Sequence, residues 1–562
     1  MKDPRPAPDG WLLDTLRALR ATLERVDVEE ATCLAALHAN HRDSARNLLQ
    51  VMAFHRHAHP DLPKALRLRG LCPLTDGDTH LLSSLEAVIT ALEALEGLGP
   101  MAATPAPLGD PDVLQRQGER LFGAVAAPGG AGLMVTLPAE AAERPALIAD
   151  LLQAGMTIAR IDCAHGDPEV WGRMVEGITQ TRAAAGRPCA IAMDLAGPKL
   201  RTGQLAPQPA VIRARPPRDR MGRATQPVRI LAVPPGATPA PQDPDVVLLP
   251  ARLSKAKRLR PGDRLRGHDA SGRRRTLTVL RRLPDGLLLR AGRTCRFVAG
   301  LVFRQRHGKA RLLVGPLAPV SGERLLRPGD ALRLTPEPDR GAGTLPCTLP
   351  EVFFDLRLGE RVLFDAGRIG GVIRGVAPQE VVLEVTAARA RGSRLGSDRG
   401  INLPDSDRRT PALSAKDIDD LAFVARHADL IGCSGVHRDS DLQTLRQCLE
   451  DRGRTDLALL LTINTRQAFL NLPRLLLAAM GHAAPVGVMI ARGDLAIECG
   501  WEALAPIQEE ILRICTAAHV PCLWSTETVL EGIVARSTGD PSKTKLTGLA
   551  FRSNGEADDP LP

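Results

Sequence analysis

Three segments near the N-terminus repeat apolar residues at the spacing of a helix. In each segment, leucine and other apolar residues recur at positions i, i+3, i+4 and i+7, which places them on one face of an α-helix. The segments are 12–26, 45–57 and 79–95. We therefore predict a helical region over residues 1–99. Residues 100–130 begin with a stretch rich in proline, glycine and alanine, which predicts a linker.

From Leu133 onward, short apolar blocks alternate with helical segments. An apolar block bounded by glycine or polar residues is typical of a strand covered on both faces, and such strands form parallel sheets. The alternation predicts an α/β fold, a TIM-type (β/α) barrel in two parts, residues 131–203 and 399–536. The expected strands are Leu133–Leu137, Thr157–Asp162, Cys189–Ala196, Asp429–Gly435, Leu457–Ile463, Gly487–Ala491 and Pro521–Thr526.

The alternation ends before an eighth strand can be found. Residues 537–562 are polar and aperiodic, and we expect them to form a disordered tail. A parallel barrel short of one strand exposes two sheet edges, which is unfavourable because their backbone groups lack partners. The pattern thus predicts a barrel that is incomplete at its eighth strand.

Residues 204–398 interrupt the barrel with a different pattern. They are rich in arginine and proline, and their short apolar runs are separated by glycine and proline, as in β-barrel domains. Two nearly identical sequences, LRPGDRL at Leu259–Leu265 and LRPGDAL at Leu326–Leu332, recur in this insertion. They predict two small β modules with equivalent turns.

Composition argues against several kinds of partner and location. The formal net charge is +9, but aromatic residues make up only 2% of the chain and tyrosine is absent, so a base-stacking surface for nucleic acid is not expected. The eleven cysteines form no C-x-x-C pair, which predicts free thiols. No run of 18 apolar residues occurs and the N-terminus is polar. We therefore expect a soluble, cytoplasmic protein that does not enter membranes.

A cluster of basic residues lies between the first two predicted helices. It contains His38, His41, Arg42 and Arg46, together with Asn47. The cluster has two interpretations: an anion-binding patch, or a solvated face of a helix.

The strand Gly487–Ala491 leads into the sequence Arg-Gly-Asp. Gly493 allows close approach of a ligand to the backbone, and Asp494 supplies a carboxylate. The end of a barrel strand is where such folds place their chemistry. A carboxylate there suits Mg²⁺, and free N–H groups suit phosphate or carboxylate. The alternative interpretation is an ordinary turn between strand and helix.

Five stretches, in this order, resemble the pyruvate kinase family, and the match is closest to atypical bacterial members with a helical N-terminal extension and no C-terminal domain. The resemblance implies phosphoryl transfer from phosphoenolpyruvate to ADP in glycolysis, giving pyruvate and ATP, with Mg²⁺ or Mn²⁺ and with K⁺. It also implies that the insertion acts as a lid, and it is compatible with a homo-oligomer. The stretches are GMTIARIDCAHG (155–166), MDLAGPKLRTG (193–203), 399–421, MIARGDLAIE (489–498) and PCLWSTETVLE (521–531).

The resemblance assigns roles to particular positions. Arg160 matches the arginine that contacts the phosphate, and Arg201 matches a basic position beside the nucleotide. Asp494 matches a metal ligand, and Gly493 offers its N–H to the substrate carboxylate. Thr526 matches the threonine at the carboxylate and methylene end of the substrate. A one-residue insertion makes Thr528 the alternative.

The fifth strand departs from the family pattern. Where the family has Lys-Ile-Glu, this chain has Thr462, Ile463 and Asn464, so a cation and a metal-binding carboxylate are missing. Loss of one such electrostatic contact commonly lowers a rate by about two to four orders of magnitude. The carbonyl of Asn464 can still offer Mg²⁺ a weaker ligand.

The family's monovalent-cation site is altered as well. The four ligand positions read Asp162, Ala164, Asp194 and Leu195, so two oxygen-bearing side chains are lost and one carboxylate is added. These changes predict little dependence on K⁺.

Three functional hypotheses follow. The chain is a pyruvate kinase homologue whose activity is impaired by the changes on the fifth strand. Alternatively, it is an inactive protein that binds phosphoenolpyruvate or nucleotide, or it is a truncated gene product.

Overall fold

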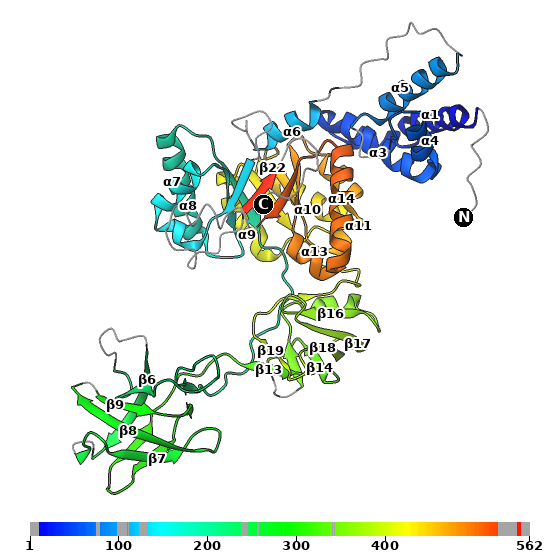
Figure 1. The fold of residues 1–562 in the computed structure, drawn as a ribbon. Coiled ribbons are helices and arrows are strands. Elements are labelled where there is room, and N and C mark those ends of the chain that lie inside the picture. Colours follow the sequence, from blue (N-terminus) through cyan, green and yellow to red (C-terminus); the bar gives the residue numbers. More distant parts are fainter. Residues whose placement is uncertain are drawn as a thin grey trace. The chain divides into compact units, whose positions relative to one another are not determined.

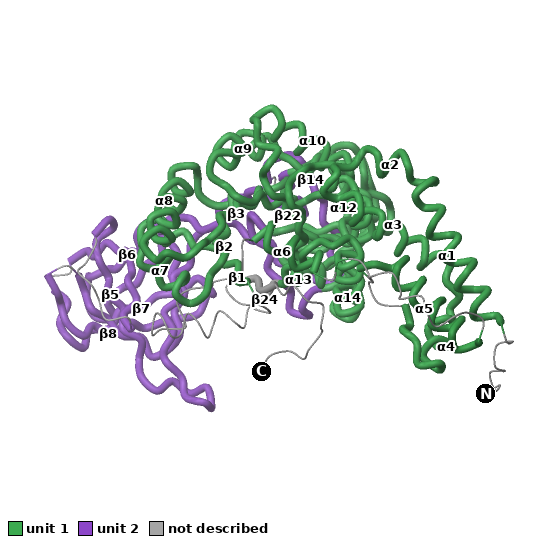
Figure 2. The backbone as a smooth tube through the Cα atoms, turned by 90° about the horizontal axis from the view of Figure 1, so that it is seen from above, with its two compact units in different colours: residues 1–200, 349–387, 400–562 green, residues 201–348, 388–399 purple. Residues whose placement is uncertain are grey.

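The computed structural model describes residues 10–74, 79–97, 110, 112–122, 132–237, 245–255, 258–284, 286–339, 341, 343–526 and 548–551. The chain divides into two compact units (Figure 2). Unit 1 comprises residues 1–200, 349–387 and 400–562, and unit 2 comprises 201–348 and 388–399.

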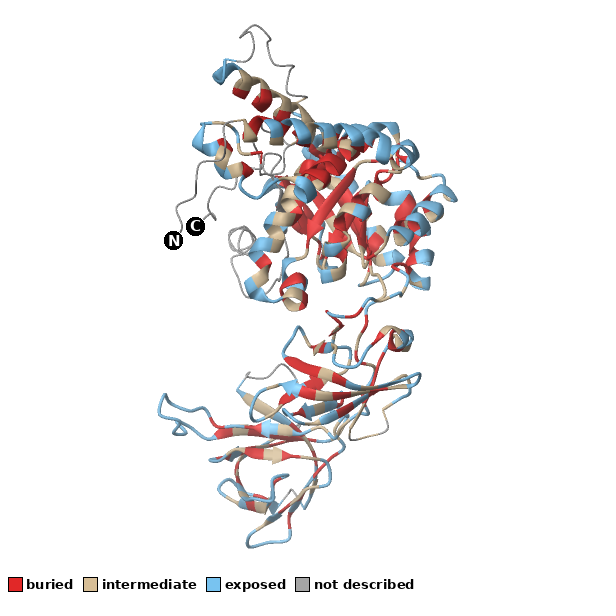
Figure 3. Cartoon of the chain, turned by 90° about the vertical axis from the view of Figure 1, so that its right-hand side faces the viewer, coloured by how far each residue is buried: buried red, intermediate tan, exposed pale blue. Residues whose placement is uncertain are grey.

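Seven parallel strands form most of a barrel in unit 1 (Figure 1), as the apolar blocks predicted. Most of their residues are buried, as the burial colours of Figure 3 show, which is typical of strands covered on both faces. The strands are β1 (Gly132–Thr136), β2 (Met156–Asp162), β3 (Ala190–Leu195), β21 (Leu430–Ser434), β22 (Ala458–Ile463), β23 (Val486–Ile490) and β24 (Cys522–Thr526).

An eighth strand, β25 (Gly548–Phe551), closes the ring, so the prediction of an incomplete barrel is wrong. This strand runs antiparallel to both of its neighbours, β1 and β24. It lies within the segment 537–562 for which we expected disorder; the rest of that segment is outside the described residues. The physical reason for closure is that β25 gives partners to the backbone groups of two strands that would otherwise be sheet edges.

Helices of unit 1 surround the ring. Several begin at capping residues that satisfy free N–H groups: the Asp167 side chain caps α8, and Ser414 and Asp417 form a capping box on α9. The helices are α7 (Pro145–Gln153), α8 (Pro168–Ala185), α9 (Ala415–His427), α10 (Asp439–Glu450), α11 (Arg466–Leu470), α12 (Leu472–Ala479), α13 (Arg492–Cys499) and α14 (Trp501–Ala517), with 3₁₀ turns at Ala139–Ala142 and Pro350–Asp355.

A helix absent from our prediction, α6 (Val113–Phe122), lies in the range 100–130 that we expected to be a linker. Its last two residues, Leu121 and Phe122, are buried. They belong to one apolar cluster with strand residues that include Met134 and Leu460. A Cβ atom on Gly487 would collide with the Leu121 side chain. Glycine at this position of β23 therefore makes room for α6, which fills part of the barrel interior.

The N-terminal helices form a bundle that packs against the barrel, and the helical prediction for this region is confirmed. Leucines of α1, α3 and α5 belong to the same hydrophobic core as the barrel helices. The helices are α1 (Trp11–Glu29), α2 (Ala31–Ala36), α3 (Arg42–His57), α4 (Leu62–Leu68) and α5 (Leu81–Leu95), with a 3₁₀ turn at Ala39–His41.

Polar residues of α3 and the turn before it attach this bundle to the barrel. The Asn47 amide donates to the Ala517 carbonyl (2.8 Å), and Ser44 Oγ lies 2.9 Å from His519 Nδ1. His41 Nε2 lies 3.0 Å from the Ala484 carbonyl. Neither interpretation of the basic cluster describes the buried His41 and Asn47, which join two parts of one unit.

Unit 2 contains a closed barrel of seven strands, ordered β11-β12-β6-β5-β9-β8-β7. The two repeated turns are equivalent, as predicted: Asp263 accepts from the Arg260 N–H (2.9 Å) and Asp330 from the Arg327 N–H (2.7 Å). The strands of unit 2 are β4 (Ile212–Ala214), β5 (Val228–Val233), β6 (Val246–Ser254), β7 (Arg264–His268), β8 (Arg274–Leu283), β9 (Gly286–Ala291), β10 (Cys295–Phe297), β11 (Val302–Gln305), β12 (Arg311–Val314), β13 (Glu323–Leu326), β14 (Ala331–Thr335), β15 (Thr344–Pro346) and β19 (Ser393–Gly396).

Part of the predicted insertion belongs to unit 1. It forms β16 (Arg361–Phe364), β17 (Ile369–Ala377) and β18 (Glu380–Ala387), and β16 also pairs with β20 (Ile401–Asn402). All eleven cysteines are free. Among the described residues, no helix is both long and apolar enough to span a membrane.

Truncation of the Leu121 side chain of α6 should destabilise the protein. We expect Leu121→Ala to lower the free energy of unfolding by about 2–5 kcal/mol, because the barrel interior would keep a cavity. Chemical denaturation measures the change. Leu68→Ala is the matched control, since Leu68 is 80% exposed and its loss should cost within about 0.5 kcal/mol. Equal effects of the two substitutions would contradict the position of α6.

Acid should weaken the attachment of the helical bundle. Burial lowers the pKa of His41 and of His519, and it lowers the pKa of His482 to about 4. Unfolded histidine has a pKa near 6.5, so below that pH the unfolded chain takes up protons that the folded chain does not, and stability falls as the pH falls. For His482 the loss between pH 7.5 and 5.0 is about 2 kcal/mol.

Denaturation of His482→Gln at both pH values tests this. The variant should lose less stability on acidification than the parent, whereas the exposed His427→Gln should behave like the parent. If His482→Gln lost as much stability on acidification as the parent, buried His482 would not be a source of the pH dependence.

Candidate functional site

The carboxyl ends of the parallel strands bring most of the predicted site residues to one end of the barrel. Asp162 ends β2, Asp194 is the penultimate residue of β3, and Thr462 is the penultimate residue of β22. Asn464 follows β22 directly, and Asp494 follows β23 in the first turn of α13. Because the strands are parallel, their ends meet at the same opening of the barrel.

Arg160 is held in place by residues of the two neighbouring strands. Its Nη1 donates to Thr136 Oγ1 of β1 (2.8 Å), and its Nη2 forms an ion pair with Asp194 of β3. Burial opposes the charge of Arg160, but the carboxylates of Asp194 and Asp162 outweigh it and raise the pKa of Arg160. The side chain is 17% exposed, so a charged, oriented guanidinium remains accessible to an anion.

Asp194 is itself fixed by its surroundings. It is buried, and Ser434 Oγ lies 3.3 Å from Oδ1 as a donor. A Cβ atom on Gly432 would collide with the Asp194 carboxylate, so only glycine fits at this point of β21. The carboxylate therefore serves Arg160 and Ser434 in this structure.

Two oxygen atoms at the end of β22 have no partner among the described residues. They are Thr462 Oγ1 and Asn464 Oδ1, and both are buried. A buried polar atom without a hydrogen bond is destabilising by about 1–3 kcal/mol, so such atoms call for an explanation. A bound cation that these oxygens coordinate, or a ligand that forms hydrogen bonds with them, is one explanation.

The first turn of α13 carries Gly493 and Asp494. N–H groups in a first helical turn have no acceptor within the helix, and the helix dipole favours an anion there. A Cβ atom on Gly493 would meet nothing within 4 Å, so packing does not require glycine at this position. Partial desolvation raises the pKa of Asp494, and Lys199 opposes the rise, although Asp494 keeps an exposed surface.

The ends of β22 and β23 are joined directly. The Ala491 N–H donates to the Ile463 carbonyl (3.1 Å), which places the start of α13 beside the segment that carries Asn464. An amide carbonyl and a carboxylate are thus available from adjacent strands.

A buried polar group beside these residues escaped the sequence analysis. Glu498, one turn after Asp494 on α13, is 2% exposed and accepts from the Asn402 amide (2.9 Å). Burial raises the pKa of Glu498, while Asn402 and Arg408 oppose the rise. Two signals were available: Glu498 ends the family-like stretch 489–498, and its spacing of four residues from Asp494 places both acids on one helical face.

Arg408 and His437 belong to the same group. Arg408 Nη2 lies 3.4 Å from His437 Nε2, and His437 Nδ1 lies 3.2 Å from Thr465 Oγ1. Burial, aided by Arg408, lowers the pKa of His437 to about 3, so its ring is neutral. Burial also lowers the pKa of Arg408, and its Nε has no described partner. Arg408 lies within the family-like stretch 399–421, but no role was assigned to it, and no motif marked His437.

Other predicted residues lie elsewhere or outside the description. Arg201 belongs to unit 2, where its Nη1 donates to the Asp398 carbonyl (3.1 Å). Thr526 ends β24, but its side chain is outside the described residues, as is all of Thr528.

The donor set fits one of the two implied cations. Asp494 and the unpartnered Asn464 Oδ1 suit a hard divalent cation whose other ligands are water and phosphate oxygens. Within the described ranges, no group of three or more histidine, cysteine, aspartate or glutamate side chains forms a metal cage. The residues at the monovalent site do not fit K⁺. Asp194 is ion-paired with Arg160, and Asp162 Oδ1 accepts a hydrogen bond from the Ala164 N–H (3.0 Å).

Known proteins resemble this chain over the barrel. The family model for the pyruvate kinase barrel domain matches residues 131–215 and 326–545. The pyruvate kinase of Corynebacterium efficiens is 27% identical over 231 residues, which cover 41% of this chain and 46% of that protein. The rat enzyme named pyruvate kinase PKLR is 29% identical over 194 residues, covering 34% of this chain and 31% of that protein.

The chain spans less than half the length of these relatives in the matched regions. The interruption of the family match, from 216 to 325, contains the strands of the closed barrel in unit 2. The two matched segments together cover more than half of the chain, and they contain all seven parallel strands. The chain therefore belongs to the pyruvate kinase family.

Proposed function

We propose that the chain binds phosphoenolpyruvate and a divalent cation at the carboxyl end of its barrel and transfers the phosphoryl group to ADP slowly. The observation that carries this proposal is Arg160, a charged guanidinium braced by Thr136 and Asp194 and still accessible. Such a group recognises phosphate by charge-assisted hydrogen bonds.

Each residue has a defined task in this proposal. Arg160 binds the phosphate, and the N–H groups of Gly493 and Asp494 bind the substrate carboxylate. Asp494 and Asn464 hold Mg²⁺, which when bound neutralises phosphate charge. The family resemblance, and not the geometry of unit 1, assigns Thr526 to the methylene end of the substrate and Arg201 to the nucleotide.

Slow turnover follows from the end of β22. Phosphoryl transfer depends on positioning and on stabilising developing negative charge. Thr462 is 3% exposed and neutral, so it supplies no positive charge to stabilise the moving phosphoryl group. Asn464 is also neutral, so it supplies no carboxylate for the divalent cation. This same observation favours a second candidate, a protein that binds phosphoenolpyruvate without turnover.

Restoring the two charges should restore the rate. Thr462 and Asn464 lie two residues apart at the end of one strand, so Lys and Glu there would share a face. We expect Thr462→Lys with Asn464→Glu to raise phosphoenolpyruvate-dependent turnover at least about a hundredfold. An assay coupled to lactate dehydrogenase, with Mg²⁺ and ADP, measures the rate.

The matched control is Thr462→Met with Asn464→Gln, which adds similar bulk without charge. A calorimetric titration with phosphoenolpyruvate separates the two candidate functions. Binding with a rate that rises only in the charged variant supports the enzyme; binding with no rate in either variant supports the binding protein. No binding at all would overturn both.

Turnover should be almost the same in K⁺ and in Na⁺. The Asp194 carboxylate is already taken by Arg160 and Ser434, so a monovalent cation would have to displace a buried ion pair. The coupled assay in matched concentrations of KCl, NaCl and LiCl tests this. A strong and selective stimulation by K⁺ would show that Asp194 exchanges its partner.

A further inference from the structure

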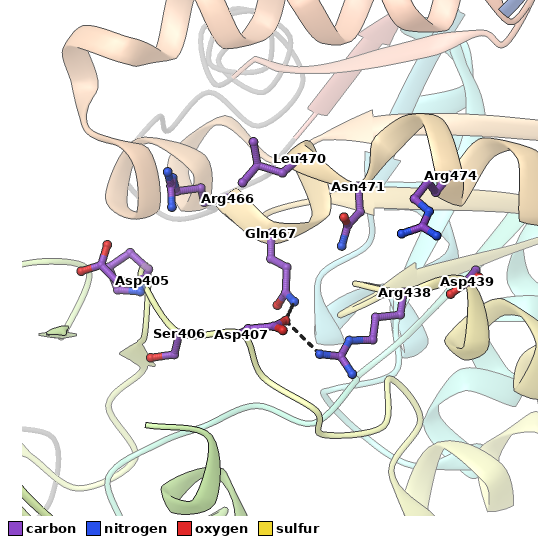
Figure 4. A pocket seen from close by; sticks show the side chains of 11 residues that line it. Asp405, Ser406, Asp407, Arg438, Asp439, Arg466, Gln467, Leu470, Asn471 and Arg474 are labelled. Atoms are coloured by element: carbon purple, nitrogen blue, oxygen red, sulfur yellow. Dashed lines mark hydrogen bonds and ion pairs between the residues drawn. The ribbon is translucent and has the colours of Figure 1, made fainter. Parts of the chain in front are cut away.

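A cavity in unit 1, lined in part by the segments that follow strands β21 and β22, contains none of the residues proposed above for catalysis. It encloses about 550 Å³, a volume typical of small-molecule sites. The cavity is bounded by the loop 404–407, the start of α10, and helices α11 and α12 (Figure 4). Its lining residues are Pro404, Asp405, Ser406, Asp407, Arg438, Asp439, Arg466, Gln467, Leu470, Asn471 and Arg474.

Two of its acidic residues are neutralised by ion pairs. Asp405 accepts three hydrogen bonds from Arg361: from the guanidinium at 2.7 and 2.8 Å and from the backbone N–H at 3.1 Å. Asp407 accepts from Arg438 at 2.9 Å and also from the Gln467 amide. Bidentate and charge-assisted contacts of this kind leave little negative charge free to repel an anion.

Two of its arginines have no such partner. The guanidinium groups of Arg466 and Arg474 make no hydrogen bond or ion pair with any residue that the structure describes. Asp439 is the remaining acid, and its carboxylate accepts only from the adjacent Ser440 N–H among the described groups (3.1 Å). The lining holds three arginines and three aspartates, but Asp405 is paired with Arg361 from outside the lining and Asp407 with Arg438. Among the lining residues, Arg466 and Arg474 therefore face Asp439 as the one acid without an ion pair to a described residue.

A hydrogen bond brings Arg474 toward Arg438. The Asn471 amide donates to the His437 carbonyl (2.7 Å), which ties the start of α12 to the start of α10. Arg474 lies three residues after Asn471 on the same helical face, and Arg438 follows His437 directly. The N-terminal ends of α10 and α12, where the helix dipole is positive, face this region as well.

We propose that this cavity binds a small phosphorylated molecule. Its phosphate lies against Arg474, whose guanidinium has no described partner, and beside Arg438, which keeps its ion pair with Asp407. Its polar body extends toward Arg466 and Gln467. The buried Gln467 Oε1 has no described partner and accepts a hydroxyl hydrogen of the ligand.

The cavity is connected to the barrel opening by short contacts. The Arg466 N–H donates to the Glu498 carboxylate, and Arg466 lies two residues after Asn464. Thr465, between them, contacts His437. A ligand that fixes Arg466 and Asn471 therefore also restrains the residues that position Asn464 and α13.

Calorimetric titration of the full chain tests the proposal. The probes are glycerol 3-phosphate, inorganic phosphate and uncharged glycerol. We expect glycerol 3-phosphate to bind more tightly than inorganic phosphate, and glycerol not to bind. Arg474→Gln should weaken glycerol 3-phosphate binding at least about tenfold, because one charge-assisted contact is lost. Arg513→Gln on α14, outside the cavity, should leave it unchanged.

Phosphoenolpyruvate, titrated into the same variants, keeps this test separate from the proposed function. Undiminished phosphoenolpyruvate binding by Arg474→Gln supports a second site, and its loss would overturn the proposal by merging the cavity with the barrel site. Equal binding of glycerol 3-phosphate by parent and variant would also overturn it. So would equal affinities for inorganic phosphate and glycerol 3-phosphate, because the polar body would then add nothing.

Discussion

Every strand of the large barrel has a hydrogen-bonding neighbour on both sides, and this closure governs the remaining structure. Seven parallel strands leave two edges, and β25 satisfies both by running in the opposite direction. The closed ring gathers the carboxyl ends of β2, β3, β22 and β23 at one opening. It also makes the interior narrow enough for a few side chains to fill, including Leu121 and Phe122 of α6.

Charge is distributed unevenly around that opening. Arg160 and Asp194 satisfy each other on β2 and β3, while the end of β22 presents buried, neutral oxygens without partners. Ground-state recognition of an anion needs only a positioned cation such as Arg160. Acceleration of phosphoryl transfer also needs a cation near the phosphoryl group as it moves. In the proposed function, binding and chemistry therefore depend on different positions, and the neutral Thr462 and Asn464 stand where the family resemblance implies charged groups.

Local pattern was enough to predict the parallel strands and the N-terminal helices, because each carries its own apolar period. The strand β25 was missed because four residues that run antiparallel produce no strand-helix alternation. The ten-residue helix α6 was missed because its apolar residues form two pairs, one at each end, separated by six polar or small residues, and it follows a linker composition. Motifs located Arg160 and Asp494. They gave no role to Arg408, although it lies in the stretch 399–421, and did not mark His437, because the contact between the two joins segments that are distant in the sequence.

The burial of α6 inside the barrel has a consequence for synthesis on the ribosome. Leu121 and Phe122 are translated long before β23, whose Gly487 provides the space they occupy. Until β23 emerges, this apolar end of α6 has no complete binding surface and stays exposed to other chains. Nascent protein with exposed apolar segments is prone to aggregation and is a typical client of chaperones. Slow translation through residues 123–486 would extend that vulnerable period, so codon usage in this interval bears on the yield of folded protein.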